Sequence, residues 1–408
     1  MSTLGERIRK LRKQQKMTLE TLAGSELTKG MLSLIENNKA NPSIESLNYI
    51  AYRLNVDVAE LLEEISGHEL RAVLEKAEIL LNTRYDELTN EHQQLIELVE
   101  PYASKLTQGY ESARLLEMYS KCLFHEKKDG WEPLINRAAT MYEQMNLTTK
   151  RGDIGLFLAA VPFYSRDYQK SLDILHIERA ELEANPLWID PLSRLDYDYL
   201  ETALLFAVGN SEEAIQVMDK AIEFSNKNKI FNQVDNLYRL AAFQAMMSED
   251  EEKKNYYLQK LISYGEFADD EDSKVFTQYA EIHYLNSYKK MYEEADHLYN
   301  SLSIRGTEKK LYTPFFLLER GKTLYGLQKF EEAIEKLNEV LIPDILQHPI
   351  DLSIFYEKDA YIALCYMDLN EKEKALEFAK IALDNINEMP DTPYKAFIKE
   401  TYEKVKRD

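Results

Sequence analysis

A pattern that recurs about every 40 residues constrains the fold of this 408-residue chain more than any other feature. Each copy has an apolar helical stretch, a short turn, and a small residue near the start of a second helical stretch. The clearest copies are LLERGKTLYGLQKFEEAIEKLNEVL at 317–341 and DAYIALCYMDLNEKEKALEFAKIAL at 359–383. The marker residues of six copies are Ser171, Ala214, Asn255, Ala295, Ala333 and Ala375. Small residues here let paired helices approach closely, so the pattern predicts stacked helical hairpins.

The pattern resembles the tetratricopeptide repeat, although its period is longer than the usual length of roughly 34 residues. This resemblance implies a right-handed α-solenoid over residues 111–408, in which first helices line a concave groove. Asn232 and Asn236 lie one turn apart, and a pair of amides can hold the backbone of an extended peptide. The residues predicted to bind peptide are Tyr199, Asn232, Asn236, Arg239, Gln244 and Lys322. The alternative is that they are ordinary polar residues on solvent-exposed faces.

The first 56 residues differ from the rest of the chain in charge. They contain nine lysines and arginines against five acidic residues, whereas the whole chain has a formal net charge of −21. A basic end on an acidic body predicts that only this end meets a polyanion such as DNA. Only 13 glycines and 11 prolines interrupt the chain, which predicts an all-α fold.

Five short helices are predicted within residues 1–65 from apolar stripes and capping residues. Their predicted starts are Thr3, Thr18, Thr28, Asn41 with Pro42 as the first helical residue, and Asp57 with Glu60. The second and third helices form a helix-turn-helix, in which the third helix enters the major groove of DNA. The residues predicted to hold this third helix on its bundle are Leu27, Met31, Leu32 and Ile35.

The segments IRKLRKQQKMTLETLA and LTKGMLSLIENNKANPSIESLNYIAYRLNVDVAELL resemble the Xre/Cro-like helix-turn-helix family. Residues predicted to contact base edges are Thr28, Lys29, Gly30, Ser33 and Leu34. Residues predicted to contact phosphates are Asn37, Asn38, Lys39 and Asn41. Two positions depart from the family, because Leu19 follows Thr18 where glutamine is usual and Leu34 replaces a usual polar residue. A five-helix bundle that contacts protein is the alternative.

The order of the two parts resembles the cytoplasmic peptide-pheromone receptors of the Rgg, PlcR, PrgX and NprR type. This resemblance implies a homodimeric transcription regulator whose partners are a double-stranded DNA operator and a short signalling peptide. Residues 66–110 are predicted to form a linker helix and the start of the repeat array. The alternative is a repeat scaffold that acts mainly by capturing a protein partner.

Motifs of enzymes and metal sites are absent from the sequence. There is no P-loop, GxSxG or HExxH motif, and no two glycines are spaced as in a dinucleotide-binding loop. The seven histidines and two cysteines, Cys122 and Cys365, have no ligand spacing, so we expect no metal, no cofactor and a reducing cytosol. No signal peptide is evident, and the longest apolar run, 155–164, is too short to span a bilayer. We therefore expect a soluble, cytoplasmic protein that is not an enzyme.

Overall fold

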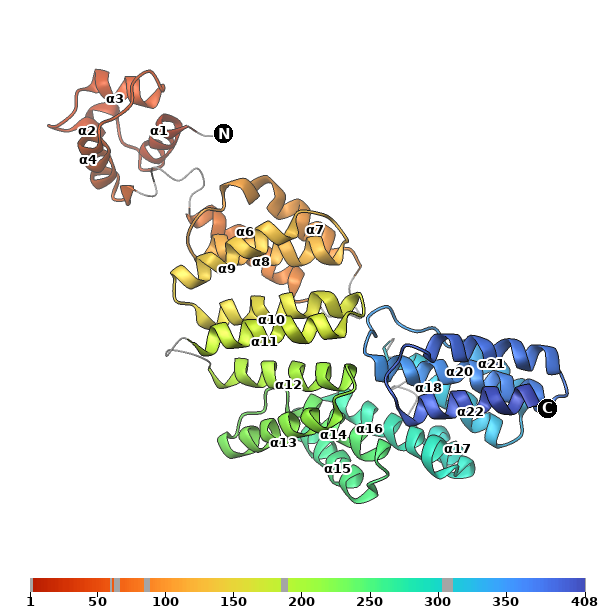
Figure 1. The fold of residues 1–408 in the computed structure, drawn as a ribbon. Helices are drawn as coiled ribbons and strands as arrows, with labels where there is room; N and C mark the ends of the chain where they lie inside the picture. The colour runs from red at the N-terminus through yellow and green to blue at the C-terminus, as the bar shows by residue number, and fades with distance from the viewer. Residues whose placement is uncertain are drawn as a thin grey trace. The chain divides into compact units, whose positions relative to one another are not determined.

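The computed structural model describes residues 3–58, 61, 67–83, 89–184, 190–302 and 311–407 (Figure 1). Every regular element in these residues is helical, which confirms the predicted all-α fold. The chain divides after Leu147 into two compact units. None of the helices in the described ranges has both the length and the apolar character needed to cross a membrane.

Four helices form a small domain at the start of the first unit. They are α1 (Leu4–Gln14), α2 (Leu19–Ala23), α3 (Lys29–Glu36) and α4 (Ile44–Leu54). Their apolar stripes meet in one core, whose fully buried side chains include Ile8, Leu22, Leu32, Ile50 and Leu54. The predicted N-caps of α2 and α3 are confirmed, because the hydroxyls of Thr18 and Thr28 accept from backbone N–H groups of the first turn.

The start of α4 differs from its prediction. Ser43 is the N-cap, and its hydroxyl accepts from the backbone N–H of Ser46 at 3.2 Å. The prediction that Asn41 caps this helix is therefore wrong, since serine caps as well as asparagine and lies nearer the apolar stripe. The predicted fifth helix, with Glu60, lies for the most part outside the described residues.

The rest of the first unit consists of two helical pairs. The elements are α6 (Gly67–Leu81), α7 (Glu91–Val99), the 3-10 helix η2 (Glu100–Lys105), α8 (Tyr110–His125) and α9 (Trp131–Gln144). In the α8–α9 pair, the carboxylate of Glu117 is buried and ion-pairs with Arg114 and Lys121. Tyr142 of α9 donates a hydrogen bond to the same carboxylate at 2.8 Å, which ties the two helices together.

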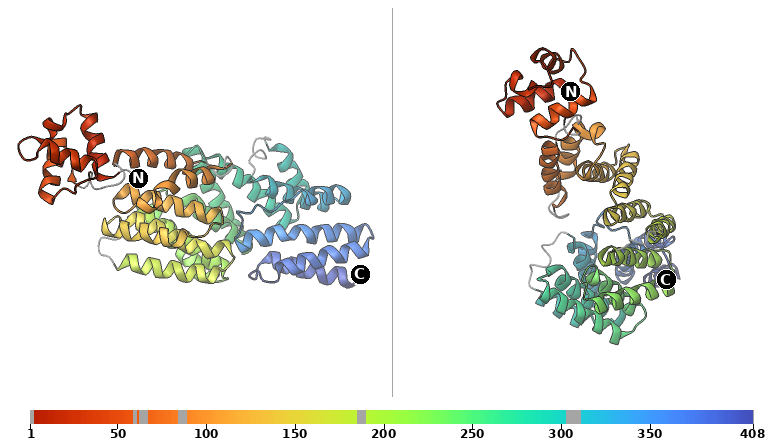
Figure 2. Two further views of the ribbon diagram at one scale, coloured as in Figure 1. Left: turned by 90° about the horizontal axis from the view of Figure 1, so that it is seen from above. Right: turned by 90° about the vertical axis from the view of Figure 1, so that its left-hand side faces the viewer.

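Helical pairs also build the second unit (Figures 1 and 2). Its first three pairs are α10 (Thr148–Tyr164) with α11 (Tyr168–Glu183), α12 (Pro191–Ala207) with α13 (Ser211–Asn228), and α14 (Val234–Met247) with α15 (Glu251–Phe267). The next are α16 (Glu271–Tyr284) with η3 (Leu285–Lys289) and α17 (Tyr292–Ser301), α18 (Thr313–Gly326) with α19 (Phe330–Asn338), and α20 (Pro349–Asp368) with α21 (Lys372–Ile386). A last helix, α22 (Pro393–Arg407), packs on the final pair.

Five of the six marker residues are fully buried, namely Ser171, Ala214, Ala295, Ala333 and Ala375. The hydroxyl of Ser171 donates to the backbone oxygen of Ala159 in the partner helix. In a later pair, a Cβ added to Gly321 would lie 2.4 Å from a methyl carbon of Leu337, so a larger residue there would force that leucine to move. Close approach therefore explains the spacing of small residues in the sequence.

One copy of the pattern is shifted by one residue from its prediction. Asn255 is exposed, whereas its neighbour Lys254 is 1% exposed and occupies the marker position. The ammonium of Lys254 reaches Glu281 at 2.7 Å and lies 4.1 Å from the ring centre of Tyr284. A long side chain is tolerated there because its charge is paired and its stem is covered by the aromatic ring.

The second unit curves until the segment before α20 contacts its first two helical pairs. Tyr168 at the start of α11 donates to the backbone oxygen of Gln347 at 2.7 Å. The next residue, His348, contacts the backbone oxygen of Ala203 in α12 through Nε2 at 3.0 Å. The segment before α20 is thereby placed beside α10 and α12, and this return contact closes one side of the cavity described below.

Candidate functional sites

The exposed side of α3 is the first candidate site. We call it the α3 surface, and its exposed residues are Thr28, Lys29, Gly30, Met31, Leu34 and Asn37. Leu32 and Ile35, on the opposite side, are buried in the domain core. The N-terminal end of a helix held in this way is free to enter a DNA groove.

Met31 is on the wrong side for its predicted role. Met31 and Leu34 are each 45% exposed, whereas Leu32 and Ile35 are buried. The prediction that Met31 packs into the bundle is therefore wrong, because the buried side of the helix is formed by Leu32, Ile35 and Glu36 and Met31 lies outside it. An exposed methionine beside an exposed leucine gives the α3 surface an apolar patch suited to thymine methyl groups.

Lys29 and Gly30 suit close approach of a ligand. The Lys29 ammonium lies 2.7 Å from a carboxylate oxygen of Glu20, and both side chains are well exposed. Such a surface ion pair is weak and can be exchanged for a phosphate or a base. A Cβ added to Gly30 would have no neighbour closer than 3.9 Å, so packing does not require glycine there.

The Asn37-Asn38-Lys39 segment after α3 has mixed roles. Asn38 has a left-handed backbone, and its side chain donates to Thr3 at 2.6 Å and accepts from the backbone N–H of Gly5 at 3.1 Å. These bonds satisfy the start of α1, so the amide of Asn38 is engaged within the domain. Asn37 donates to the backbone oxygen of Ser33 at 2.7 Å, whereas Lys39 extends from the surface.

Arg12 is basic but belongs to the structure of the domain. Its guanidinium forms two hydrogen bonds with the carboxylate of Glu36, at 2.6 and 2.8 Å, and a third to the backbone oxygen of Met17. The Arg12 side chain is 11% exposed and that of Glu36 is 4% exposed. Hydrogen bonding to Glu36 raises the pKa of Arg12, and the paired side chains fix α1 on α3.

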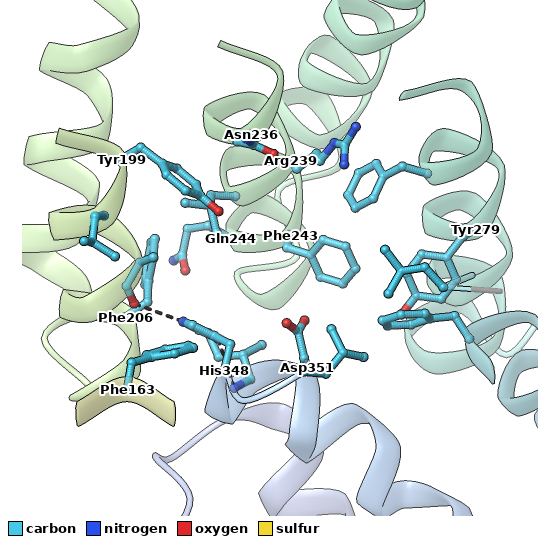
Figure 3. A pocket seen from close by; sticks show the side chains of 18 of the residues that line it. Phe163, Tyr199, Phe206, Asn236, Arg239, Phe243, Gln244, Tyr279, His348 and Asp351 are labelled. Carbon is cyan, nitrogen blue, oxygen red and sulfur yellow. Dashed lines mark hydrogen bonds between the residues drawn. The ribbon is translucent and has the colours of Figure 1, made fainter. Parts of the chain in front are cut away.

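A cavity of about 450 Å³ in the second unit is the second candidate site (Figure 3). We call it the repeat cavity. Its walls come from the first helices α10, α12, α14, α16 and α18 and from the segment that starts α20. Aromatic rings form much of its surface, among them Phe163, Tyr199, Phe206, Phe243, Tyr279 and Phe315. Concave, aromatic-rich cavities of this size are typical ligand sites.

Two polar groups in the wall of the repeat cavity lack a partner. The hydroxyl of Tyr279 and Nε of Arg239 are buried and have no hydrogen-bond acceptor or donor among the described residues. Tyr279 is only 2% exposed, and rings of Phe243 and Phe315 lie 6.1 and 5.0 Å from its own ring. Buried polar groups are almost always paired, so these two atoms indicate a site for a polar ligand.

Four of the six residues predicted to bind peptide line the repeat cavity: Tyr199, Asn236, Arg239 and Gln244. Asn236 donates from its amide to Gln233 at 2.8 Å. The guanidinium of Arg239 reaches Tyr312 and Ser273 at 3.3 Å each. Contact of these four residues with a ligand stays a prediction.

The structure places Asn232 and Lys322 elsewhere. Asn232 donates to the backbone oxygen of Leu192 at 3.1 Å and to Asp196 at 2.9 Å, so it joins α12 to the turn before α14. Lys322 is fully buried, and its ammonium lies 3.0 Å from Glu319 and 2.5 Å from Glu357. Neither residue lines the repeat cavity.

Lys322 belongs to a buried polar cluster that joins α16, α18, α20 and α22. Glu319 accepts from Lys322, from His283 Nδ1 at 2.8 Å and from Asn286 at 2.9 Å, while Tyr394 of α22 contacts His283 Nε2. Burial alone would raise the pKa of Glu319, but the charges of Lys322 and His283 outweigh it and lower the pKa to about 2. The cluster is therefore a charged, fully bonded element of the core.

Sequence reasoning missed His348 and Asp351 in the wall of the repeat cavity. His348 Nδ1 accepts a hydrogen bond from the backbone N–H of Ile350 at 3.3 Å and thereby caps α20. The other ring nitrogen, Nε2, therefore donates a hydrogen bond to the backbone oxygen of Ala203. Burial raises the pKa of Asp351, although nearby His348 opposes this effect. Both residues lie in a segment that reaches the cavity only through the return contact, so no local pattern could have identified them.

A smaller cavity of about 200 Å³ adjoins the repeat cavity. Both are lined by Phe206, Gln244, Met247 and Ile350, and the smaller one continues toward the Pro390–Pro393 turn before α22. The two cavities therefore share part of their walls.

The described residues contain no group of three or more histidine, cysteine, aspartate or glutamate side chains placed to hold a metal ion. Cys122 and Cys365 are free thiols and are buried, and burial raises the pKa of each to about 12. Buried thiols of such high pKa are inert rather than nucleophilic.

Comparison with protein families matches residues 5–66 to a helix-turn-helix domain family, which covers α1–α4. A search of curated proteins finds no match. PlcR of Bacillus thuringiensis, solved with the peptide PapR7 and DNA, is 17% identical over 76% of this chain and 98% of its own, with a TM-score of 0.30. ComR of S. thermophilus, solved with DNA and its signalling peptide ComS, is 19% identical over 69% and 99%, with a TM-score of 0.35. ComR of Streptococcus vestibularis, solved with its signalling peptide XIP, is 18% identical over 68% and 96%, with a TM-score of 0.39.

Proposed function

We propose that this chain is a DNA-binding transcription regulator, and that a short peptide in the repeat cavity controls its DNA binding or its oligomeric state. The observation that carries the proposal is the presence of two separate sites in one chain. Residues 5–66 match a helix-turn-helix domain and expose the α3 surface. The repeat cavity, in the other unit, has unpartnered polar atoms in an apolar wall.

The α3 surface supports DNA binding through the chemistry of its residues. Lys29 offers a donor to guanine, Leu34 and Met31 offer apolar contact to thymine methyl groups, and Gly30 permits close approach. Lys39 is placed after the helix, where phosphate contacts set the position of the protein on the duplex. A homodimer would read two such half-sites about one helical turn apart.

Peptide is the ligand class that the repeat cavity favours. The amides of Asn236 and Gln244 each carry a donor and an acceptor, as a peptide backbone does. Arg239 Nε is a further free donor for a carbonyl oxygen, and the aromatic rings accommodate apolar side chains. If the peptide tightens DNA binding, then DNA must tighten peptide binding by the same factor.

For DNA binding, Lys39→Ala is expected to weaken binding to every duplex and to reduce the salt slope by about one, because one phosphate contact is lost. Lys29→Ala and Leu34→Ala are expected to change the sequence preference instead, by about 1–3 kcal/mol at single base pairs. The measurement is selection from randomised duplexes, followed by fluorescence anisotropy at several salt concentrations.

The control for this DNA experiment is Lys399→Ala, which removes one positive charge from an exposed position of α22. It should leave both the selected sequence and the salt slope unchanged. If Lys29→Ala, Leu34→Ala and Lys39→Ala all select and bind duplexes like the original protein, α3 is not the element that reads DNA.

For peptide binding, Tyr279→Phe is expected to stabilise the free protein by about 1 kcal/mol, because it removes a buried hydroxyl that lacks a partner. The same change should weaken peptide binding about fivefold to tenfold, since a hydrogen bond to the ligand is lost. The full chain is incubated with an equimolar mixture of synthetic seven-residue peptides, retained peptides are identified by mass spectrometry, and their affinities are measured by calorimetry.

The matched control is Tyr197→Phe, because the Tyr197 hydroxyl is also buried but donates to the backbone oxygen of Gly152 at 3.2 Å. This control should lower stability and leave peptide affinity unchanged. If the full chain retains no peptide from the mixture, the peptide-sensing part of the proposed function fails.

A further inference from the structure

The repeat cavity has few ionisable side chains in its wall, and they differ in how well they are paired. Among the described residues that line it, Arg239 is the only lysine or arginine and Asp351 is the only carboxylic acid, and Figure 3 shows them apart from one another. Arg239 lies 3.6 Å from Asp235 and 3.8 Å from Asp270, so its positive charge is already balanced. Asp351 is therefore the one acidic group in the described part of this wall with which a cationic ligand could pair.

Asp351 is the carboxylate that remains without a cation. Figure 3 shows its carboxylate directed into the cavity, on the same side as the ring of Phe243. No lysine or arginine in the described part of the chain forms an ion pair with it. His348, the nearest basic group, is engaged through both ring nitrogens, in bonds to Ala203 and Ile350.

Aromatic rings surround the approach to Asp351. Tyr199 of α12 and Tyr279 of α16 are both close enough for its charge to act on their hydroxyl groups. The Tyr279 hydroxyl has no partner within the described structure and can accept a hydrogen bond from an ammonium or guanidinium group. An organic cation is attracted both to a carboxylate and to the faces of aromatic rings, and this part of the cavity offers both.

We propose that the peptide recognised by the repeat cavity carries a positively charged group that pairs with Asp351. This inference rests on the proposed function, and it adds the chemical class of the ligand. The charge belongs either to a lysine or arginine side chain or to the N-terminal ammonium, which share the same chemistry. An acceptor elsewhere in the peptide takes the free Nε–H of Arg239, so the two charged residues set the direction of the bound peptide.

To test this proposal, the full chain is incubated with two equimolar mixtures of seven-residue peptides. The peptides have free N-termini in one mixture and acetylated N-termini in the other, and the retained peptides are identified by mass spectrometry. The full chain should retain peptides enriched in lysine or arginine, or it should lose retention on acetylation, which identifies the source of the charge. Asp351→Asn should remove this enrichment and lower the affinity for individual cationic peptides about tenfold or more. Apolar peptides should still be retained by that variant.

Asp359→Asn is the matched control, because Asp359 is also buried on α20 but does not line the repeat cavity. It should keep the enrichment, and thermal unfolding checks that both variants fold. Retention without any preference for cations overturns this inference but leaves the proposed function intact. Persistence of the preference in Asp351→Asn overturns the assignment to Asp351, and failure to retain any peptide overturns both proposals.

Discussion

Replacing Lys322 by methionine is expected to lower the free energy of unfolding of the second unit by about 3–5 kcal/mol. The ammonium of Lys322 contacts Glu319 at 3.0 Å and Glu357 at 2.5 Å, and all three side chains are buried. Its removal leaves two carboxylates close together without a cation in an environment where charge is poorly solvated. Urea unfolding, with hydrogen exchange read from α18 and α20, measures the loss.

Lys336→Met is the matched control for this change. Lys336 pairs with Glu339 at 2.8 Å on the exposed face of α19, so water solvates both charges when the pair is broken. The control should unfold at the same urea concentration as the original protein. Adding Glu319→Gln and Glu357→Gln to Lys322→Met should restore part of the lost stability, because the uncompensated charges are then gone.

The result also decides between two roles for Lys322. A lysine that only contacts a peptide in an open groove would change ligand affinity and leave stability unaltered. A lysine that neutralises a buried cluster does the opposite. If Lys322→Met unfolds like the original protein and loses peptide affinity, then the role predicted from the sequence is right and the buried cluster is unimportant.

The sequence predicts those features that depend on neighbouring residues. Capping by Thr18 and Thr28 and the packing of Leu32 and Ile35 follow from local spacing, and each is present. Asn41 is an equally plausible cap from the sequence, but Ser43, two residues later, is the residue that caps α4. Competition between equally good capping residues is decided by where the buried stripe begins, which the local sequence alone does not determine.

Features that depend on contacts between distant residues could not be predicted from the sequence. Lys322 looks like a polar residue on a first helix, and its partner Glu357 belongs to the next repeat. The repeat pattern predicts that first helices form a groove, and they do line the cavity. It does not predict that the segment around His348 returns to α12 and contributes Asp351 to the wall, because that contact joins repeats far apart in the chain.

The second large effect is expected in the helix-turn-helix domain, from Gly5→Ala. A Cβ on Gly5 would lie 2.1 Å from the backbone oxygen of Ile35 and 2.8 Å from Oδ1 of Asn38. A backbone oxygen at the end of α3 cannot move aside as a flexible side chain can, so α1 must shift away from α3. Overpacking of this kind costs about 2–3 kcal/mol.

That cost is large for so small a domain. A unit of about 60 residues has a total stability of roughly 3–9 kcal/mol, so Gly5→Ala should remove a large part of it. Hydrogen exchange should speed up in α1–α4 and stay unchanged in α10–α22, and DNA affinity should fall while peptide affinity is kept. The measurement thus separates the two candidate sites within one full-length variant.

Gly30→Ala is the matched control, since it makes the same change on α3, where the nearest atom to the new Cβ would be 3.9 Å away. It should stabilise the helix by about 0.5–1 kcal/mol, because alanine restricts the unfolded chain more than glycine does. Opposite effects of the two substitutions on stability would show that contact between α1 and α3, rather than loss of a glycine, sets the result. Equal effects would mean that the close approach of α1 to α3 does not hold this domain together.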